Sequence, residues 1–243
     1  MNYELKNKVA IITGASSGYG VGIARKFKKA GAKLWIVARR KELLQDVAQD
    51  LGVNYFVGDI RNPEDWDQLF EEVIRAEGRV DILVNNAGSA IKIEELTGQE
   101  DKAIRESLEV NLLGAIYGSK RAAGLMVKQK SGTIVNVSSI CSIQAWPGWS
   151  VYAAAKAGLE QFSKSLYVEL RNKGVRVNCI TPSWGNTSFT EASKLPEFDS
   201  DIQNRVIQPE EMGEIVLNIC CLPDHLVVPE MVVLPMVQEI VPY

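Results

Sequence analysis

The sequence predicts an α/β protein built on one doubly wound parallel sheet of about seven strands, with helices on both faces. Short runs rich in β-branched residues alternate with amphipathic helical patterns along the 243 residues. These runs are continuously apolar, which is typical of strands that are covered on both faces. The chain shows no internal repeat or linker, so we expect one domain over residues 1–243.

The predicted strands follow from the apolar runs in chain order. They cover residues 9–12, 34–37, 54–57, 82–84, 133–137, 175–180 and 231–234. Most of the intervals between them are long enough for the crossover helices that parallel strands require. This is the pattern of a Rossmann-type sheet, in which ligands bind at the carboxyl ends of the strands. We therefore expect the functional residues directly after the strands.

Helical periodicity occupies several of these intervals. One helix follows Gly20, and a second starts at Asn62-Pro63, which is a favourable pair for the N-cap and the first helical position. Two longer helices fit residues 101–129 and 152–172.

Composition excludes several classes of function. The formal charge is −3, from 27 basic and 30 acidic residues without a basic run, so we expect no nucleic-acid partner. The N-terminal apolar run is too short for a signal or a membrane span, and no other stretch reaches spanning length. The four cysteines have no C-x-x-C spacing and read as thiols of a reducing compartment, which predicts a cytoplasmic protein. The single histidine, His225, leaves little for a Ser-His-Asp triad or a histidine metal site, so no metal is expected.

A glycine-rich turn joins the first strand to its helix. Such glycines permit a tight turn and a close approach of the backbone to a pyrophosphate, whose charge lies on the helix N-terminus. A tight connection without a ligand is the alternative, but the position after the first strand favours a dinucleotide. The expected cofactor residues in this turn are Gly14, Ser16, Ser17, Gly18, Tyr19 and Gly20.

The residues after the second strand favour NADP(H) over NAD. An NAD site usually has an acid there, whereas this chain has Arg39 and Arg40. Arginine can bind a 2′-phosphate through two hydrogen bonds, and two cations at a helix start are otherwise unfavourable. Further candidate cofactor residues follow the third and fourth strands, where turn formation is an equally good explanation. They are Asp59, Ile60, Asn86, Ala87 and Gly88.

Candidate catalytic residues follow the fifth strand. Ser138 and Ser139 end that strand, and Tyr152 and Lys156 lie one turn apart at the start of a helix. Tyrosine is a weak base with an ordinary pKa of about 10. A nearby ammonium favours the phenolate, so Lys156 is expected to lower the pKa of Tyr152 toward neutrality.

Taken in order, these motifs resemble the short-chain dehydrogenase/reductase family over essentially the whole chain. The matching residues are Thr13-Gly14-x-x-x-Gly18-x-Gly20, Asp59, Asn85-Asn86-Ala87-Gly88, Asn111, Ser139 and Tyr152-x-x-x-Lys156. The resemblance implies that Tyr152 is the acid/base and that Ser139 orients the substrate oxygen. It implies that Lys156 lowers the tyrosine pKa and binds the nicotinamide ribose, and that Asn111 holds a water of a proton relay.

The resemblance also implies roles after the sixth strand and an assembly. Pro182 and Thr187 are expected near the nicotinamide, although Ser183 stands where the family often has glycine, so this loop is expected to run differently. The family usually forms homodimers or homotetramers through its two long helices.

The substrate is expected between the nicotinamide and the segments 89–96, 140–149 and 183–208, of which the last is lid-like. Trp146, Trp149 and Trp184 lie in or beside this region and could line an apolar pocket. The C-terminal stretch 222–238 resembles the branch of NADP-dependent 3-hydroxy acid and serine dehydrogenases and small-aldehyde reductases. A small hydroxy acid or polar aldehyde is therefore the leading substrate, a bulkier alcohol such as a hydroxysteroid is the alternative, and a non-catalytic dinucleotide sensor is a third interpretation.

Overall fold

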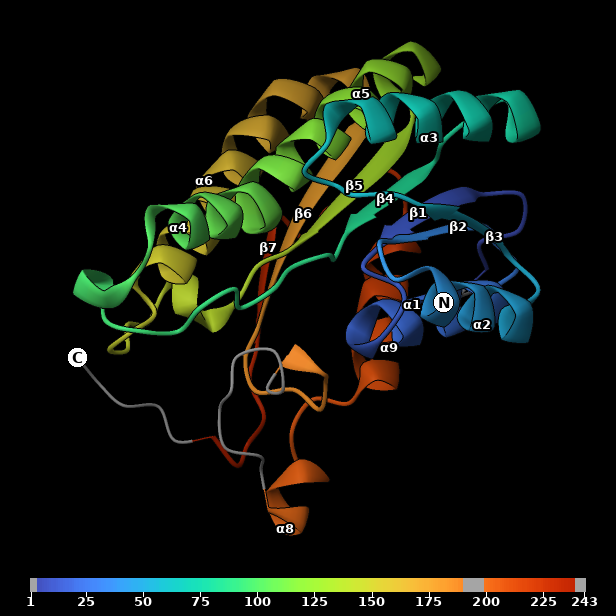
Figure 1. The fold of residues 1–243 in the computed structure, drawn as a ribbon. Coiled ribbons are helices and arrows are strands. Elements are labelled where there is room, and N and C mark those ends of the chain that lie inside the picture. The colour runs from blue at the N-terminus through green and yellow to red at the C-terminus, as the bar shows by residue number, and fades with distance from the viewer. Residues whose placement is uncertain (1–3, 190–198, 239–243) are drawn as a thin grey trace.

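The computed structural model describes residues 4–189 and 199–238, and one parallel sheet forms its centre (Figure 1). The strand order in this part of the chain is β3-β2-β1-β4-β5-β6-β7. All neighbouring strands are parallel, and β1 lies between β2 and β4. The strands are β1 (Val9–Thr13), β2 (Lys33–Ala38), β3 (Asn54–Val57), β4 (Ile82–Asn85), β5 (Gly132–Val137), β6 (Val175–Pro182) and β7 (Glu230–Val233).

Helices cover both faces of the sheet (Figure 1). One face carries α1 (Gly18–Lys29), α2 (Lys41–Leu51) and α9 (Pro209–Cys220); the other carries α3 (Pro63–Glu77), α4 (Asp101–Leu108), α5 (Gly114–Gln129) and α6 (Ser150–Leu170). Within β1, Ala10 and Ile12 belong to the first core, and Val9 and Ile11 belong to the second. Both faces of the strand are buried, which explains why its sequence shows no alternation.

The predicted fold class is confirmed, and each predicted strand is present with shifts of one or two residues at its ends. The predicted helix over 101–129 is helical throughout, but Glu109–Leu113 forms a π-helical turn between α4 and α5. The helix predicted over 152–172 is α6, which begins two residues earlier and ends in a short 3₁₀ turn. Among the helices of residues 4–189 and 199–238, none is long and apolar enough to cross a membrane.

Two glycines bring α1 and α9 into backbone contact. A Cβ atom on Gly22 would lie 1.9 Å from the carbonyl oxygen of Pro209, and one on Gly213 would lie 2.4 Å from the carbonyl oxygen of Gly22. Backbone atoms cannot move aside cheaply, so this crossing depends on the absence of both side chains. The contact fixes α9, and thereby the end of the segment 183–208, against the helix that follows the glycine-rich turn.

Candidate functional site

A cleft of about 1170 Å³ lies at the carboxyl ends of the strands, where the sequence predicted it. Most of the expected site residues line this cleft. They are Gly14, Ser16, Ser17, Gly18, Tyr19, Arg39, Arg40, Ile60, Asn86, Ala87, Gly88, Ser139, Trp146, Trp149, Tyr152, Lys156, Pro182, Trp184 and Thr187. Three expected residues, Gly20, Asp59 and Asn111, do not line it. The topology therefore brings together residues that are up to 173 positions apart in the sequence, from Gly14 to Thr187.

The glycine-rich turn leaves the start of α1 open to an anion. Gly14 and Gly18 have φ values of 68° and 55°, and a Cβ on Gly14 would lie 2.7 Å from the Cα of Ala87. Ser17, at the N-cap, makes no side-chain capping bond, and the first turn of α1 contains no acidic residue. Free N–H groups and the positive end of the helix dipole are what a pyrophosphate binds. This cradle fits a dinucleotide.

Arg40 is held across the mouth of this turn. Its Nη2 atom donates to the hydroxyl oxygens of Ser17 at 2.6 Å and Ser16 at 2.9 Å. Arg39 points elsewhere, with its Nη1 atom 3.9 Å from a carboxylate oxygen of Asp59 and its side chain 52% exposed. Of the two expected arginines, Arg40 is therefore the one already placed beside the glycine-rich turn.

The carboxylate of Asp59 forms an ion pair with the neighbouring Arg61. Arg61 donates from Nε to both carboxylate oxygens at 3.0 Å and from Nη2 to Oδ2 at 2.6 Å. Burial acts to raise the pKa of Asp59, but the hydrogen bonds and charge of Arg61 outweigh it and hold that pKa below its usual value. No sequence pattern indicates this pair, and the adenine contact of Asp59 stays a prediction.

Asn86 joins the ends of two neighbouring strands. Its Nδ2 atom donates to the carbonyl oxygen of Thr13 at 2.9 Å, and its backbone N–H donates to the Thr13 hydroxyl at 3.1 Å. Ala87 donates to the same hydroxyl, so β1 and β4 are held in register where the glycine-rich turn begins. Gly20 allows the start of α1 to approach this turn closely, because a Cβ on Gly20 would lie 2.4 Å from the carbonyl oxygen of Gly14.

Tyr152 and Lys156 are buried together at the end of β5. Tyr152 is 7% exposed and Lys156 is 3% exposed. The Lys156 Nζ atom donates to the carbonyl oxygen of Val137 at 2.9 Å and lies 5.8 Å from the centre of the Tyr152 ring. Ser139 accepts from the backbone N–H of Cys141 at 3.3 Å, whereas Ser138 donates to the carbonyl oxygen of Lys156. The structure thus places the expected serine, tyrosine and lysine side by side.

Burial sets the protonation of this pair. It raises the pKa of Tyr152 well above its usual value, the Cys141 thiol acts in the same direction, and hydrogen bonding by Ser139 opposes it. Burial also lowers the pKa of Lys156 to about 8. The tyrosine pKa in the protein alone is therefore raised and not lowered as expected, because desolvation of the phenolate is the largest influence on it. At neutral pH Tyr152 is a phenol and can donate a proton.

Asn111 lies in the π-helical turn and is 1% exposed. Its Oδ1 atom accepts from the backbone N–H of Ser89 at 3.0 Å, and its Nδ2 atom donates to the carbonyl oxygens of Ser89 at 2.8 Å and Ser107 at 3.0 Å. The amide thereby fixes the segment that follows Gly88. Its expected role in a proton relay stays a prediction.

Glu160 is a site residue that sequence reasoning missed. It lies one turn after Lys156 on α6, and its Oε1 atom accepts from the hydroxyls of Ser142 at 2.5 Å and Thr181 at 2.6 Å. One carboxylate oxygen thus links α6 to the segment after Ser139 and to the end of β6. The four-residue spacing from Lys156 was the available signal, since it places both side chains on one helix face.

The segment after β6 is described on both sides of residues 190–198, which lie outside the described residues. Its first part approaches the glycine-rich turn, because a Cβ on Gly18 would lie 3.1 Å from the Cβ of Thr187. Ser183 donates from its backbone N–H to the carbonyl oxygen of Val233 at 3.0 Å, and it does not adopt a positive φ. The serine that stands in place of glycine is therefore unstrained here. The short helix α8 (Ser200–Gln203) follows.

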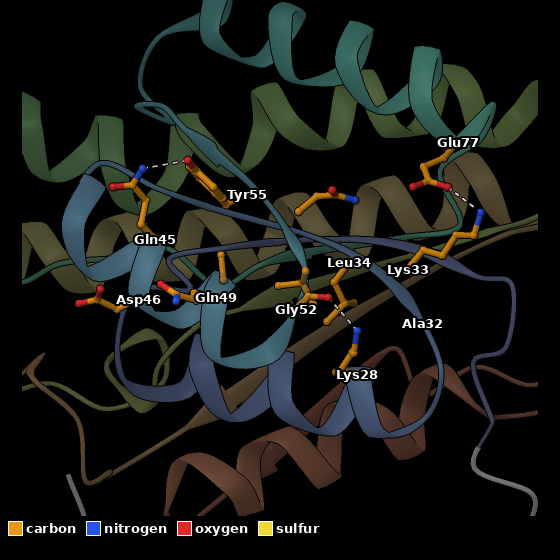
Figure 2. Close-up of a pocket in the computed structure, with 13 residues that line it drawn as sticks. Lys28, Ala32, Lys33, Leu34, Gln45, Asp46, Gln49, Gly52, Tyr55 and Glu77 are labelled. Carbon is orange, nitrogen blue, oxygen red and sulfur yellow. Dashed lines mark hydrogen bonds and ion pairs between the residues drawn. The ribbon is translucent and has the colours of Figure 1, made fainter.

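A second hollow, of about 810 Å³, lies away from this cleft, near the amino ends of β2 and β3 (Figure 2). Its cations already have partners. Lys28 donates to the carbonyl oxygen of Gly52 at 2.8 Å, and Lys33 pairs with Glu77 at 2.7 Å. Within residues 4–189 and 199–238, His, Cys, Asp and Glu side chains form no group of three or more that could hold a metal ion.

Comparison with known proteins gives one consistent family. The family model described as short chain dehydrogenase matches residues 8–197. An uncharacterized oxidoreductase of Staphylococcus aureus strain USA300 is 31% identical over 234 residues, covering 95% of this chain and 98% of that protein. A Staphylococcus epidermidis protein with the same description is 30% identical, covering 96% of this chain and 99% of its own length.

Solved structures agree with this assignment over nearly the whole chain. A serine dehydrogenase in its closed form with NADP⁺ superposes with a TM-score of 0.88 at 29% identity, covering 97% of this chain and 98% of that one. A short-chain dehydrogenase/reductase of unknown function from Caenorhabditis elegans, solved with cofactor, gives a TM-score of 0.85 at 30% identity, covering 96% and 95%. Serine dehydrogenase from Escherichia coli gives 0.84 at 27% identity, covering 96% and 100%.

Proposed function

Because this chain belongs to the short-chain dehydrogenase family, we propose that it is an NADP(H)-dependent oxidoreductase that interconverts a hydroxyl and a carbonyl group. The observation that carries the proposal is the buried pair Tyr152 and Lys156, with Ser139 beside it, in the same cleft as the glycine-rich turn. An ammonium and a phenol are costly to bury without a use, and perturbed groups in a cleft are characteristic of catalysis.

The preference for NADP(H) is supported by the cleft and by similar structures. The open N-terminus of α1 would hold the pyrophosphate, and Arg40 would hold the 2′-phosphate. The serine dehydrogenase similar to this chain was solved with NADP⁺. A nicotinamide bound in this cleft would supply a hydride to a carbonyl carbon or accept one from an alcohol carbon.

The chain's own residues would handle the proton and the substrate oxygen. In reduction, the Tyr152 hydroxyl donates its proton to the carbonyl oxygen as the hydride arrives at carbon, which yields the alcohol and a phenolate. The Ser139 hydroxyl donates a hydrogen bond that orients the same oxygen. The Lys156 ammonium stabilises the phenolate and would bind the nicotinamide ribose. Since burial raises the pKa of Tyr152, the hydroxyl keeps its proton at neutral pH, which is the protonation state that reduction requires.

The proposal extends to the domain organisation, the proton relay, the assembly and the substrate of the protein. The chain would act as one domain, residues 1–243, with the segment 183–208 covering the substrate. Asn111 would complete a proton relay. The protein would work in the cytoplasm as a homodimer or homotetramer, and light scattering would test the assembly. On resemblance alone, a small hydroxy acid or polar aldehyde is the leading substrate and a bulkier alcohol is the alternative.

A Tyr152→Phe variant tests the mechanism. General acid–base catalysis contributes about 10²–10⁴-fold, so kcat for carbonyl reduction should fall to about 1% or less. The affinity for NADPH, measured by titration calorimetry, should be unchanged. Tyr167→Phe on the same helix is the matched control and should keep full activity. Unchanged turnover in Tyr152→Phe would contradict the assignment, and NADPH binding without any carbonyl reduction by the parent protein would favour the sensor interpretation.

A further inference from the structure

Three aromatic rings, two from the start of α6 and one from the segment after β6, pack together at the reactive end of the cleft. The centre of the Tyr152 ring lies 5.5 Å from that of Trp149, edge to face at 73°, and 5.5 Å from that of Phe189, tilted by 57°. The Trp149 and Phe189 rings are stacked, with centres 6.3 Å apart and planes within 17°. Trp149 precedes α6 and Phe189 follows β6, so the two stacked rings pack together against the tyrosine and the three form one compact cluster.

Further apolar side chains continue this wall. The cleft is also lined by Ile140, Cys141, Trp146 and Trp184. A flat apolar group placed beside the Tyr152 hydroxyl could therefore contact rings and thiol, while the hydroxyl of Ser139 remains for the substrate oxygen. Aromatic side chains at such spacings favour stacked and edge-to-face contacts with another ring.

On the described part of the cleft wall the arginines lie away from this region, and the cation near it, Lys156, is buried beside Tyr152 and belongs to the proposed proton-transfer pair. Its cations there are Arg39, Arg40 and Lys156. The arginines follow β2, at the cofactor end, and the Lys156 ammonium donates to Val137. The described acid in the wall is Asp199, whose carboxylate caps α8 through the N–H of Ile202 at 2.8 Å. A substrate carboxylate at the aromatic end would thus be desolvated among rings, without an arginine of the described wall to pair with it.

We infer that the substrate is a neutral carbonyl compound that carries a flat apolar ring, aryl or alicyclic, and that carboxylated substrates are disfavoured. The inference rests on the proposed function, since it assumes that a carbonyl is reduced beside Tyr152. It reverses the order of the two substrate classes that sequence resemblance suggested. The reason is that the aromatic cluster depends on Phe189, which resemblance did not identify.

Matched pairs of carbonyl compounds test the inference directly. Initial rates of NADPH oxidation would be measured for benzaldehyde against 4-carboxybenzaldehyde, and for cyclohexanone against 4-oxocyclohexanecarboxylate. The neutral member of each pair should have a kcat/KM at least about tenfold higher, because an unpaired carboxylate is costly to desolvate. Equal values, or a preference for the carboxylated member, would overturn the inference and leave the proposed reaction standing.

Variants test whether the rings cause the preference. Trp149→Ala and Phe189→Ala should each lower kcat/KM for benzaldehyde about fivefold while changing that for glycolaldehyde less, since only the larger substrate loses ring contacts. Tyr55→Ala is the matched control, because Tyr55 is an aromatic residue on β3 that is 40% exposed. Equal losses for both substrates in the two pocket variants would count against a ring-binding role.

A binding measurement separates this inference from the proposed function. If NADPH binds but no carbonyl is reduced, the proposed function fails. The pocket would then be judged by calorimetric titration of 2-naphthalenemethanol and 2-naphthoate into the NADP⁺-loaded protein. Tighter binding of the neutral alcohol supports the apolar pocket, and tighter binding of the carboxylate refutes it.

Discussion

Replacing Arg40 with alanine should weaken NADPH binding far more than NADH binding. The two cofactors differ only in the 2′-phosphate, so an interaction with that phosphate affects one affinity and not the other. Arg40 is the better candidate of the two arginines because Ser16 and Ser17 hold its guanidinium at the glycine-rich turn. Arg39 leans toward the Asp59 carboxylate and is half exposed.

The size of the effect follows from the exposure of the side chain. A hydrogen bond to a charged group contributes about 1.5–3 kcal/mol. Arg40 is exposed to solvent, which screens the interaction and places it near the lower limit. A loss of about 1.5 kcal/mol corresponds to roughly tenfold in Kd. Arg39→Ala should cost about two- to threefold, because the nearby Asp59 already offsets part of its charge.

Calorimetric or fluorescence titration of both cofactors into both variants would measure these values. We expect the Kd of Arg40→Ala for NADPH to rise about tenfold and that for NADH to change by less than about twofold. Raising the salt concentration should reduce the difference in NADPH affinity between the parent protein and Arg40→Ala, since Arg40 is exposed and salt screens its charge. Equal losses for NADPH and NADH would show that Arg40 shapes the turn rather than binding the phosphate. A larger effect of Arg39→Ala would refute the geometric reasoning.

Two further predictions concern Lys156 and the crossing of α1 and α9. The pKa of Lys156 falls from 10.5 to about 8 on folding, so the folded chain holds fewer protons between these values and the parent gains stability as pH rises through them. The unfolding free energies of the parent protein and of Lys156→Met would be measured by urea titration. The difference between them should grow in favour of the parent by on the order of 1 kcal/mol between about pH 7 and pH 9. A difference that does not change with pH would contradict this prediction. Gly22→Ala should lower the unfolding free energy by about 1–3 kcal/mol, since its Cβ would meet the Pro209 carbonyl. Gly124→Ala in α5 is the control, because nothing lies within 4 Å of that Cβ, and it should be neutral or stabilising.

The fold class could be read from local patterns because local forces produce them. A strand covered on both faces needs a continuous apolar run, as Val9–Thr13 shows, and a helix beside it needs an apolar stripe. The carboxyl-end rule then placed the glycine-rich turn, Arg40 and Ser139 at one edge without knowledge of any contact. The resemblance to a family supplied the roles of Tyr152 and Lys156, which spacing alone could not.

Departures from expectation occur where a contact joins distant segments. The π-helical turn at Glu109–Leu113 interrupts a pattern that reads as one helix, and Asn111 there binds the backbone after β4. The Glu160 carboxylate accepts hydrogen bonds from Ser142 and Thr181, which are 18 and 21 positions away in the sequence. Neither partner can be chosen from periodicity, because periodicity reports which face is buried and not which side chain lies opposite.

By itself, the sequence determined the order of the strands along the chain, the burial of both sheet faces and the edge at which a ligand binds. The tertiary structure decided which arginine lies beside the phosphate-binding turn, which aromatic rings surround Tyr152, and the direction of its pKa. The physical reason is that desolvation and pairing depend on every group that packs around an atom. Chain folding sets those groups, and for Tyr152 they include Phe189, which is 37 residues further along the chain.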